Sequence, residues 1–205
     1  MIRERLAEVI HRETDLVVCG EAEERHQAMQ GIRTTKPDLA IIDLTLKDSH
    51  GLDLIKDLRI ADPEVLILVV SMHDDSLHAE RVIRAGALGY ITKQEATKNI
   101  LQAIRTVLAG EIYLSDQTAL RLAGKLAGRI PAQSAPAIDK LTDRELRVLE
   151  LIGQGFGTRQ IAATLRLGVP TIETYRARIK EKLQLKDASE LLQYAIRLRQ
   201  TGGAK

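Results

Sequence analysis

The chain has 205 residues, enough for one or two domains that each bury a core of their own. Its single cysteine, Cys19, excludes an internal disulfide and a zinc site built from several cysteines. Cys19 lies in the apolar stretch 16–19, which predicts a small buried side chain. The sequence has no apolar run of about 20 residues and no signal-peptide core, so we expect a cytoplasmic protein.

The net charge of +2 hides an asymmetry between the two halves of the chain. Residues 1–112 carry 14 basic and 19 acidic side chains, whereas residues 113–205 carry 16 basic and 9 acidic ones. A basic half predicts contact with a polyanion if it also contains a binding motif.

The first half alternates between helical and strand-like patterns. The periodicity of apolar residues predicts helices over 2–13, 23–35, 51–61, 75–85 and 95–109, and strands over 16–20, 39–43, 65–71 and 88–92. We expect Gly86 to end the fourth helix in a left-handed conformation. Strands that alternate with helices at this spacing predict a parallel sheet wound on both faces.

Three chemically distinct residues close successive apolar runs. Asp43 ends the run 39–43, Ser71 ends the run 65–71, and Lys93 follows the run 88–92. The carboxyl ends of parallel strands meet at one edge of an open α/β sheet, where such folds keep their chemistry. A carboxylate there can take a phosphoryl group as a nucleophile, and an ammonium group can neutralise phosphoryl oxygens.

The second half is helical throughout. A linker over 113–140 contains a short helix at 116–126 and a stretch rich in proline and small residues at 130–137. Helices are predicted over 142–153, 158–165, 170–183 and 187–199. Thr142 and Glu145 form a capping box at the first of them. We expect Gly168 to supply a permissive backbone at the tight turn before Pro170.

With Gly51 and Tyr90, the residues Asp43, Ser71 and Lys93 resemble those of bacterial response-regulator receiver domains. The segments 20–22, 37–39 and 84–93 resemble the NarL/FixJ subfamily. The resemblance implies a flavodoxin-like fold, phosphorylation of Asp43 by a sensor histidine kinase, and Mg²⁺ beside it. It also implies that Ser71 and Lys93 contact the phosphoryl group and that Tyr90 rotates as the switch.

The family pattern begins with a strand that carries two acidic Mg²⁺ ligands, and this sequence begins at the first helix. In the strand order 2-1-3-4-5 that strand is central. We therefore expect a receiver without its first strand and a weak metal site at Asp43 and the backbone of Thr45. Three explanations stay open: a start assigned too far downstream, a receiver that pairs its strands differently or borrows an edge from a second chain, and a cloned fragment. Glu21, Glu23 and Glu24 are expected at a solvated helix start rather than as substitute ligands.

Residues 141–199 resemble a LuxR-type helix-turn-helix, whose recognition helix is expected at 170–183. We expect residues near the bases at Glu173, Thr174 and Ala177, and residues near the DNA backbone at Thr158, Arg159, Thr171, Arg176, Arg178 and Lys182. In related proteins the last helix forms the dimer contact, and here its apolar face comprises Leu191, Leu192, Ala195 and Ile196.

Together these patterns predict a receiver-like domain over 1–112, a linker over 113–140 and an all-α four-helix DNA-binding domain over 141–205. The expected function is a homodimeric, DNA-binding transcriptional regulator controlled by phosphorylation of Asp43. The alternative is a phosphorylation-independent regulator whose receiver serves as a dimerisation or docking module. An aspartate-based phosphatase usually needs a second Asp two residues after the nucleophile, where this chain has Thr45, so no enzyme is expected.

Overall fold

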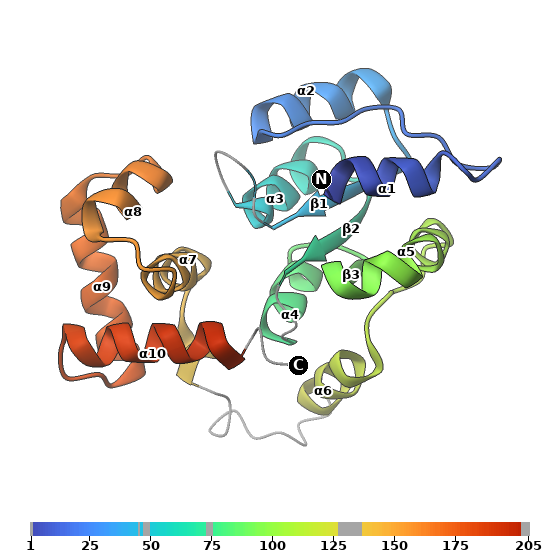
Figure 1. The fold of residues 1–205 in the computed structure, drawn as a ribbon. Coiled ribbons are helices and arrows are strands. Elements are labelled where there is room, and N and C mark those ends of the chain that lie inside the picture. Colours follow the sequence, from blue (N-terminus) through green and yellow to red (C-terminus); the bar gives the residue numbers. More distant parts are fainter. Residues whose placement is uncertain (1, 45, 47–49, 73–75, 127–136, 202–205) are drawn as a thin grey trace. The chain divides into compact units, whose positions relative to one another are not determined.

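The computed structural model describes residues 2–44, 46, 50–72, 76–126 and 137–201 (Figure 1). The chain forms two compact units, residues 1–122 and residues 123–205. No helix among the described residues is long and apolar enough to cross a lipid bilayer.

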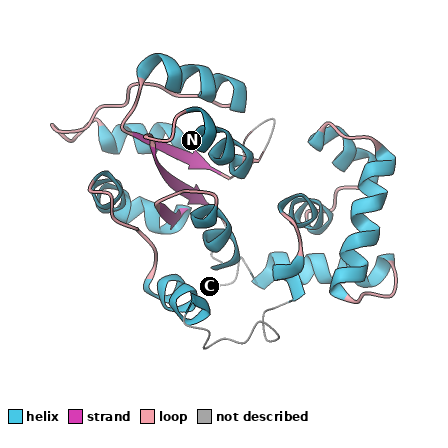
Figure 2. Cartoon of the chain, turned by 180° about the vertical axis from the view of Figure 1, so that it is seen from behind, coloured by secondary structure: helices cyan, strands magenta, loops and turns pink. Residues whose placement is uncertain are grey.

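The first unit is built on a parallel sheet. Among the described residues it has three strands in the order β1 (Leu39–Asp43), β2 (Leu66–Ser71) and β3 (Gly89–Thr92), drawn in magenta in Figure 2. Asp43 is paired with Val70, and Ser71 is paired with Thr92. This register brings the carboxyl ends of all three strands to one edge of the sheet.

One face of the sheet is covered by α3 (Gly51–Ala61) and α4 (Ser76–Arg84). The strands contribute Ile42, Ile67, Val69 and Tyr90 to this layer, and α3 contributes residues such as Ile55. A further helix, α2 (Arg25–Thr35), packs on α3, to which the Arg25 guanidinium is tied by an ion pair with Asp57.

The opposite face is covered by α1 (Ile2–Ile10) and α5 (Lys93–Leu108), which lie in front of the strands in Figure 1. Here the strands contribute Leu68, Val70 and Ile91, which alternate with the residues of the first layer because successive strand side chains point to opposite faces. The prediction of a parallel sheet wound on both faces is confirmed.

The prediction of a strand over residues 16–20 is wrong. These residues adopt no regular structure, Val17 is 79% exposed, and Leu16 and Val18 pack only partly against the α1–α5 layer. A strand requires a hydrogen-bonded neighbour, and among the described residues β1 pairs with β2 alone. Cys19, expected to be buried, is consequently exposed.

The chain leaves α5 through Gly110, at φ +79°, and returns to the sheet. The Tyr113 N–H donates to the Leu88 carbonyl at 3.0 Å, and the Tyr90 N–H donates to the Tyr113 carbonyl at 2.9 Å. Gly89 lies between these bonds, where a Cβ atom would come within 2.6 Å of the Leu68 side chain. The start of the predicted linker thus lies along the edge of β3, and α6 (Asp116–Leu126) follows it.

Beyond α6, the described residues of the second unit form a short 3₁₀ helix, η2 (Ala137–Lys140), followed by four α-helices. These are α7 (Asp143–Gly153), α8 (Thr158–Leu165), α9 (Val169–Leu183) and α10 (Ala188–Thr201). Their fully buried side chains include Leu149, Ile161, Ile172, Ile179 and Leu191, which form the core between the helices. The four predicted helices and the buried face of the third are confirmed.

The turn between α8 and α9 differs from its predicted form. Arg166 has the left-handed backbone, at φ 53°, and caps the end of α8. Gly168 has an ordinary φ of −71° and caps the start of α9, where a Cβ atom would make only van der Waals contact. The expectation that Gly168 supplies the permissive backbone is therefore wrong. Pro170 does lie in the first turn of α9, as predicted.

Candidate functional sites

The first candidate site is the carboxyl edge of the sheet. The Nζ atom of Lys93 lies 2.5 Å from Oδ2 of Asp43, although the two residues are 50 positions apart. Lys93 is held there by a capping box at the start of α5. The Glu95 N–H donates to Oγ1 of Thr92, and the Thr92 N–H donates to Oε2 of Glu95, both at 3.1 Å. The structure thus brings together the predicted nucleophile and the predicted cation.

The start of α3 approaches the same edge closely. The Gly51 N–H donates to the Leu44 carbonyl at 2.9 Å, and a Cβ atom on Gly51 would lie 2.4 Å from the Asp43 carbonyl oxygen. The His50 side chain caps the helix by accepting a hydrogen bond from the Leu52 N–H at 3.2 Å. The position of Asp43 therefore depends on a glycine at residue 51.

The two other predicted switch residues lie on neighbouring strands. Ser71 is buried at the end of β2, one residue beyond the partner of Asp43. Tyr90 is buried in the layer beneath α3 and α4, where it clusters with Val82 and Ala87. In this structure Tyr90 therefore has its inward position.

The described residues do not fit a Mg²⁺ site. They contain no group of three or more His, Cys, Asp or Glu side chains that could hold a metal ion. The Asp43 carboxylate at the sheet edge is engaged by Lys93, and the Glu95 carboxylate accepts a hydrogen bond from the N–H of Thr92 at the end of β3. The other predicted ligand, the backbone of Thr45, lies outside the described residues.

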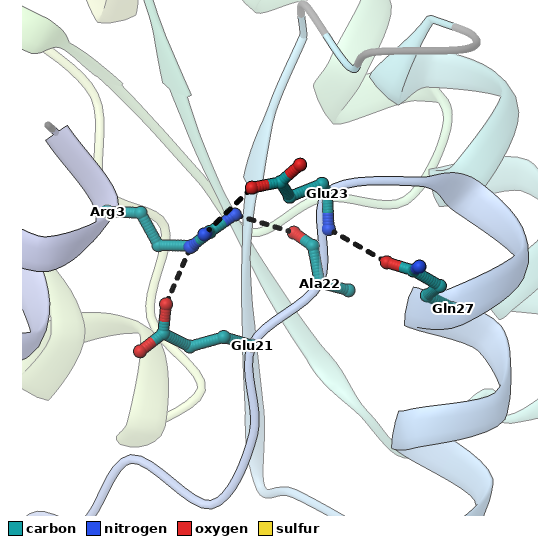
Figure 3. Close-up of polar contacts among 5 residues, drawn as sticks. All are labelled: Arg3, Glu21, Ala22, Glu23 and Gln27. Atoms are coloured by element: carbon teal, nitrogen blue, oxygen red, sulfur yellow. Dashed lines mark hydrogen bonds and ion pairs between the residues drawn. The ribbon is translucent and has the colours of Figure 1, made fainter.

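The acidic residues before α2 are engaged by a base that the sequence reasoning missed. Figure 3 shows the Arg3 guanidinium between two carboxylates: Nε lies 2.6 Å from Oε2 of Glu21, and a terminal nitrogen lies 3.1 Å from Oε1 of Glu23. These hydrogen bonds raise the pKa of Arg3. Glu21 and Glu23 therefore link α1 to the segment before α2. Arg3 and Glu21 are 18 residues apart and do not belong to one helix, so the periodicity of the sequence could not indicate that they pair.

The second candidate site is the polar face of α9 together with the start of α8. Its exposed residues include Arg159 of α8 and Thr171, Glu173, Thr174, Ala177 and Arg178 of α9. Thr158 and Arg176 are half-buried, and Nε of Arg176 lies 3.9 Å from Oε2 of Glu173. Most residues that the sequence assigned to DNA contact are thus accessible, and the three predicted base contacts lie between Glu173 and Ala177 in the middle of α9.

Lys182 differs from the other predicted contacts. Its Nζ atom lies 2.6 Å from Oε2 of Glu145, whose side chain is only 2% exposed. The capping-box pattern pointed to Glu145, but no sequence signal linked it to a lysine 37 residues later. Burial acts to raise the pKa of Glu145, but the hydrogen bonds from Lys182 and Thr142 outweigh it, so this pKa lies below its usual value.

The last helix has an apolar surface beyond the core. Leu191 and Ala195 are buried against the rest of the unit, whereas Leu192 is 43% exposed and Ile196 is 40% exposed. These two side chains lie one helical turn apart and form an apolar pair on the outer face of α10.

Comparison with known proteins assigns each half of the chain to a family. The family model of the response regulator receiver domain matches residues 1–105, and that of the luxR family of bacterial regulatory proteins matches residues 139–195. The oxygen regulatory protein NreC of Staphylococcus aureus is 33% identical over 202 residues, which cover 96% of this chain and 93% of NreC.

Solved structures of response regulators are also similar to this chain. A LuxR-family two-component response regulator from Aurantimonas sp. SI85-9A1 is 32% identical, with a TM-score of 0.57, over 62% of this chain and 90% of that one. RcsB from Salmonella enterica serovar Typhimurium, solved bound to promoter P1flhDC, has a TM-score of 0.69 over 95% of this chain and 92% of its own. At 22% identity, RcsB supports the fold alone. The chain belongs to the two-component response regulators of the NarL/FixJ type, which join a receiver domain to a LuxR-type DNA-binding domain.

Proposed function

We propose that this regulator takes a phosphoryl group on Asp43 and that this modification changes its binding to double-stranded DNA. The observation that carries the proposal is the 2.5 Å contact between Lys93 Nζ and Asp43 Oδ2 at the carboxyl edge of the sheet. Ser71 lies buried on the adjacent strand, one residue beyond the register partner of Asp43.

The reaction follows from these groups. A carboxylate oxygen of Asp43 attacks the phosphorus of a phosphohistidine on a sensor kinase. The P–N bond breaks, and the imidazole leaves with the bonding electron pair and keeps the proton already on its other ring nitrogen. The product at Asp43 is an acyl phosphate. The Lys93 ammonium then forms charge-assisted hydrogen bonds with the phosphoryl oxygens. The Ser71 hydroxyl donates a hydrogen bond to one of these oxygens. These new contacts bias the loops around Tyr90, which lies inward before the reaction.

Receiver domains commonly bind Mg²⁺ during phosphorylation. The weak site predicted at Asp43 and Thr45 offers the ion a single side-chain carboxylate, and Mg²⁺ requires near-octahedral oxygen ligands. No step of the proposed reaction therefore depends on the metal. The effect of Mg²⁺ on phosphorylation is measured in the experiment below.

The DNA-binding role is supported by the polar face of α9 and the start of α8. In this proposal Glu173, Thr174 and Ala177 lie near the bases, and Arg159 of α8 with Arg176 and Arg178 of α9 lie near phosphates. The exposed pair Leu192 and Ile196 supports a homodimer through α10, which matches two half-sites on DNA. A regulator with these partners works in the cytoplasm, and no enzymatic turnover of a separate substrate is proposed.

A second function is favoured by one observation. The described residues contain no group of three or more His, Cys, Asp or Glu side chains that could hold a metal ion, and the charge of Asp43 is already neutralised by Lys93. A receiver with this arrangement would serve as a docking or dimerisation module for a DNA-binding protein that does not respond to phosphate.

Intact mass after incubation with acetyl phosphate, with and without Mg²⁺, separates the two functions. The first function predicts a gain of one phosphoryl group in the wild-type chain and none in Asp43→Asn. A folded wild-type chain that gains nothing under either condition contradicts it and favours the second. DNA binding is measured on the same samples, so that loss of phosphorylation and loss of DNA binding are scored independently.

A further inference from the structure

Lys182, near the end of helix α9, is a cation paired with a buried carboxylate of another helix. Arg178 is exposed, whereas the Lys182 side chain is 32% exposed and its ammonium lies 2.6 Å from the Glu145 carboxylate. Two residues near it on α9, Ile179 and Leu183, are buried. An ammonium group in that position already has a partner before any DNA arrives.

Glu145 needs this partner. Its carboxylate is buried in the first turn of α7, where Oε2 also accepts a hydrogen bond from the Thr142 N–H at 2.7 Å. A buried carboxylate is costly unless an opposite charge compensates it. A move of Lys182 to a DNA phosphate would leave that charge uncompensated. The internal pair is therefore favoured over a phosphate contact.

The pair joins the last turn of α9 to the first turn of α7, two helices that pack directly against each other (Figure 1). Thr171, at the other end of α9, is about 16 Å away along the helix axis. A tilt of about 10° at the pair moves that end by about 3 Å, more than the tolerance of a preorganised site. The pair thus anchors the helix at the end remote from the bases.

We propose that Lys182 is a positioning residue: it holds Glu145 and thereby fixes the direction in which α9 presents its first half to DNA. It is not one of the residues that neutralise phosphate. The inference rests on the proposed use of α9 for DNA binding, and it replaces the sequence-based expectation that Lys182 lies near the DNA backbone.

The test uses the full-length protein and two probes of about 30 base pairs: the duplex that the wild type selects from a randomised pool, and an unrelated duplex. The dissociation constant of each is measured between about 50 and 300 mM salt, because the slope of log K against log [salt] counts neutralised phosphates. Arg178→Gln is the comparison for a true phosphate contact, and its slope should fall in magnitude by about 0.9.

Removing only the lysine leaves a buried charge and can unfold the unit. The double variant Glu145→Gln/Lys182→Met removes both charges at nearly constant volume and conserves the net charge, so it should stay folded by circular dichroism. We expect it to bind the selected duplex at least about tenfold more weakly, with an unchanged salt slope. Lys182→Arg, which can still donate to Glu145, should restore wild-type affinity.

Glu145→Gln alone gives the sharpest contrast. It makes the protein more positive and frees Lys182, so simple electrostatics predicts tighter DNA binding at every sequence. Positioning predicts weaker binding to the selected duplex instead. The inference is overturned if Glu145→Gln binds more tightly, if the folded double variant loses salt slope as Arg178→Gln does, or if its affinity is unchanged. A folded wild type that selects no duplex would overturn the proposed DNA binding itself.

Discussion

Gly51 and Asp43 are in closer contact than any residue with a side chain would allow. A Cβ atom on Gly51 would lie 2.4 Å from the Asp43 carbonyl oxygen and 2.8 Å from the Leu44 Cα, and both are backbone atoms. Gly51→Ala must therefore displace either α3 or the end of β1. We expect it to lower the free energy of unfolding by about 1–3 kcal/mol, measured by urea denaturation.

The matched control is Gly31→Ala in α2, where a Cβ atom would meet nothing within 4 Å. Replacing a helical glycine by alanine there should raise the free energy of unfolding by about 0.5–1 kcal/mol. Equal effects of the two substitutions would show that the close contact at Gly51 is not what makes glycine necessary.

A second prediction concerns Lys93. Its ammonium neutralises Asp43 now and would neutralise the transferred phosphoryl group later, so Lys93→Met should slow the gain of phosphoryl mass from acetyl phosphate by at least about tenfold. Because the pair is partly exposed, stability should change by no more than about 1 kcal/mol. Lys98→Met, on the exposed side of the same helix, should react as the wild type does.

Much of this arrangement could be predicted from the sequence because it depends on local patterns. The apolar runs that end at Asp43 and Ser71 placed both residues at strand ends, and register then brought Lys93 to Asp43. Residues 16–20 were misread because β-branched, apolar character indicates a strand without showing whether a neighbouring strand exists. The addition of Tyr113 to β3 uses backbone groups alone, which have no sequence signature.

The ion pair between Lys182 of α9 and Glu145 of α7 could not be predicted either, because it joins two helices that are far apart in the sequence. Helical periodicity shows which face of α9 contains Lys182, but not whether that position meets solvent or the start of α7. The left-handed turn falls on Arg166, the residue that directly follows the predicted end of α8, rather than on Gly168 two residues later.

A third prediction follows from the lowered pKa of Glu145. Its pKa is lower in the folded unit than in the unfolded chain, where a glutamate titrates at about 4.3, so its ionisation stabilises the fold above that pH. This stabilisation is lost as the pH falls through the lower, folded pKa. Glu145→Gln should cost about 1.5–3 kcal/mol at neutral pH. Its deficit relative to the wild type should shrink as the solution is acidified below about pH 4.3.

Thermal unfolding followed by circular dichroism between neutral and acidic pH measures this difference. Glu181→Gln, an exposed change on α9, is the control and should follow the wild type at every pH. A Glu145→Gln deficit that stays constant down to the lowest pH would contradict the assignment of a paired, ionised carboxylate.

A fourth prediction concerns the apolar pair on α10. Leu192→Lys/Ile196→Lys places two charges on the exposed face and should leave the fold intact, because neither side chain belongs to the core. Self-association measured by analytical ultracentrifugation should weaken, and so should binding to a DNA duplex with two half-sites. Ile60→Lys, on the exposed surface of α3 in the other unit, should change neither quantity.

The exposed position of Cys19 has a practical consequence. It is the only thiol in the chain, and it is exposed within the irregular segment between α1 and α2. A maleimide dye will therefore label the native protein at one known point, without substitutions. The same thiol is the one place where air oxidation can crosslink two molecules, so apparent dimers should be compared with and without reductant before they are assigned to α10.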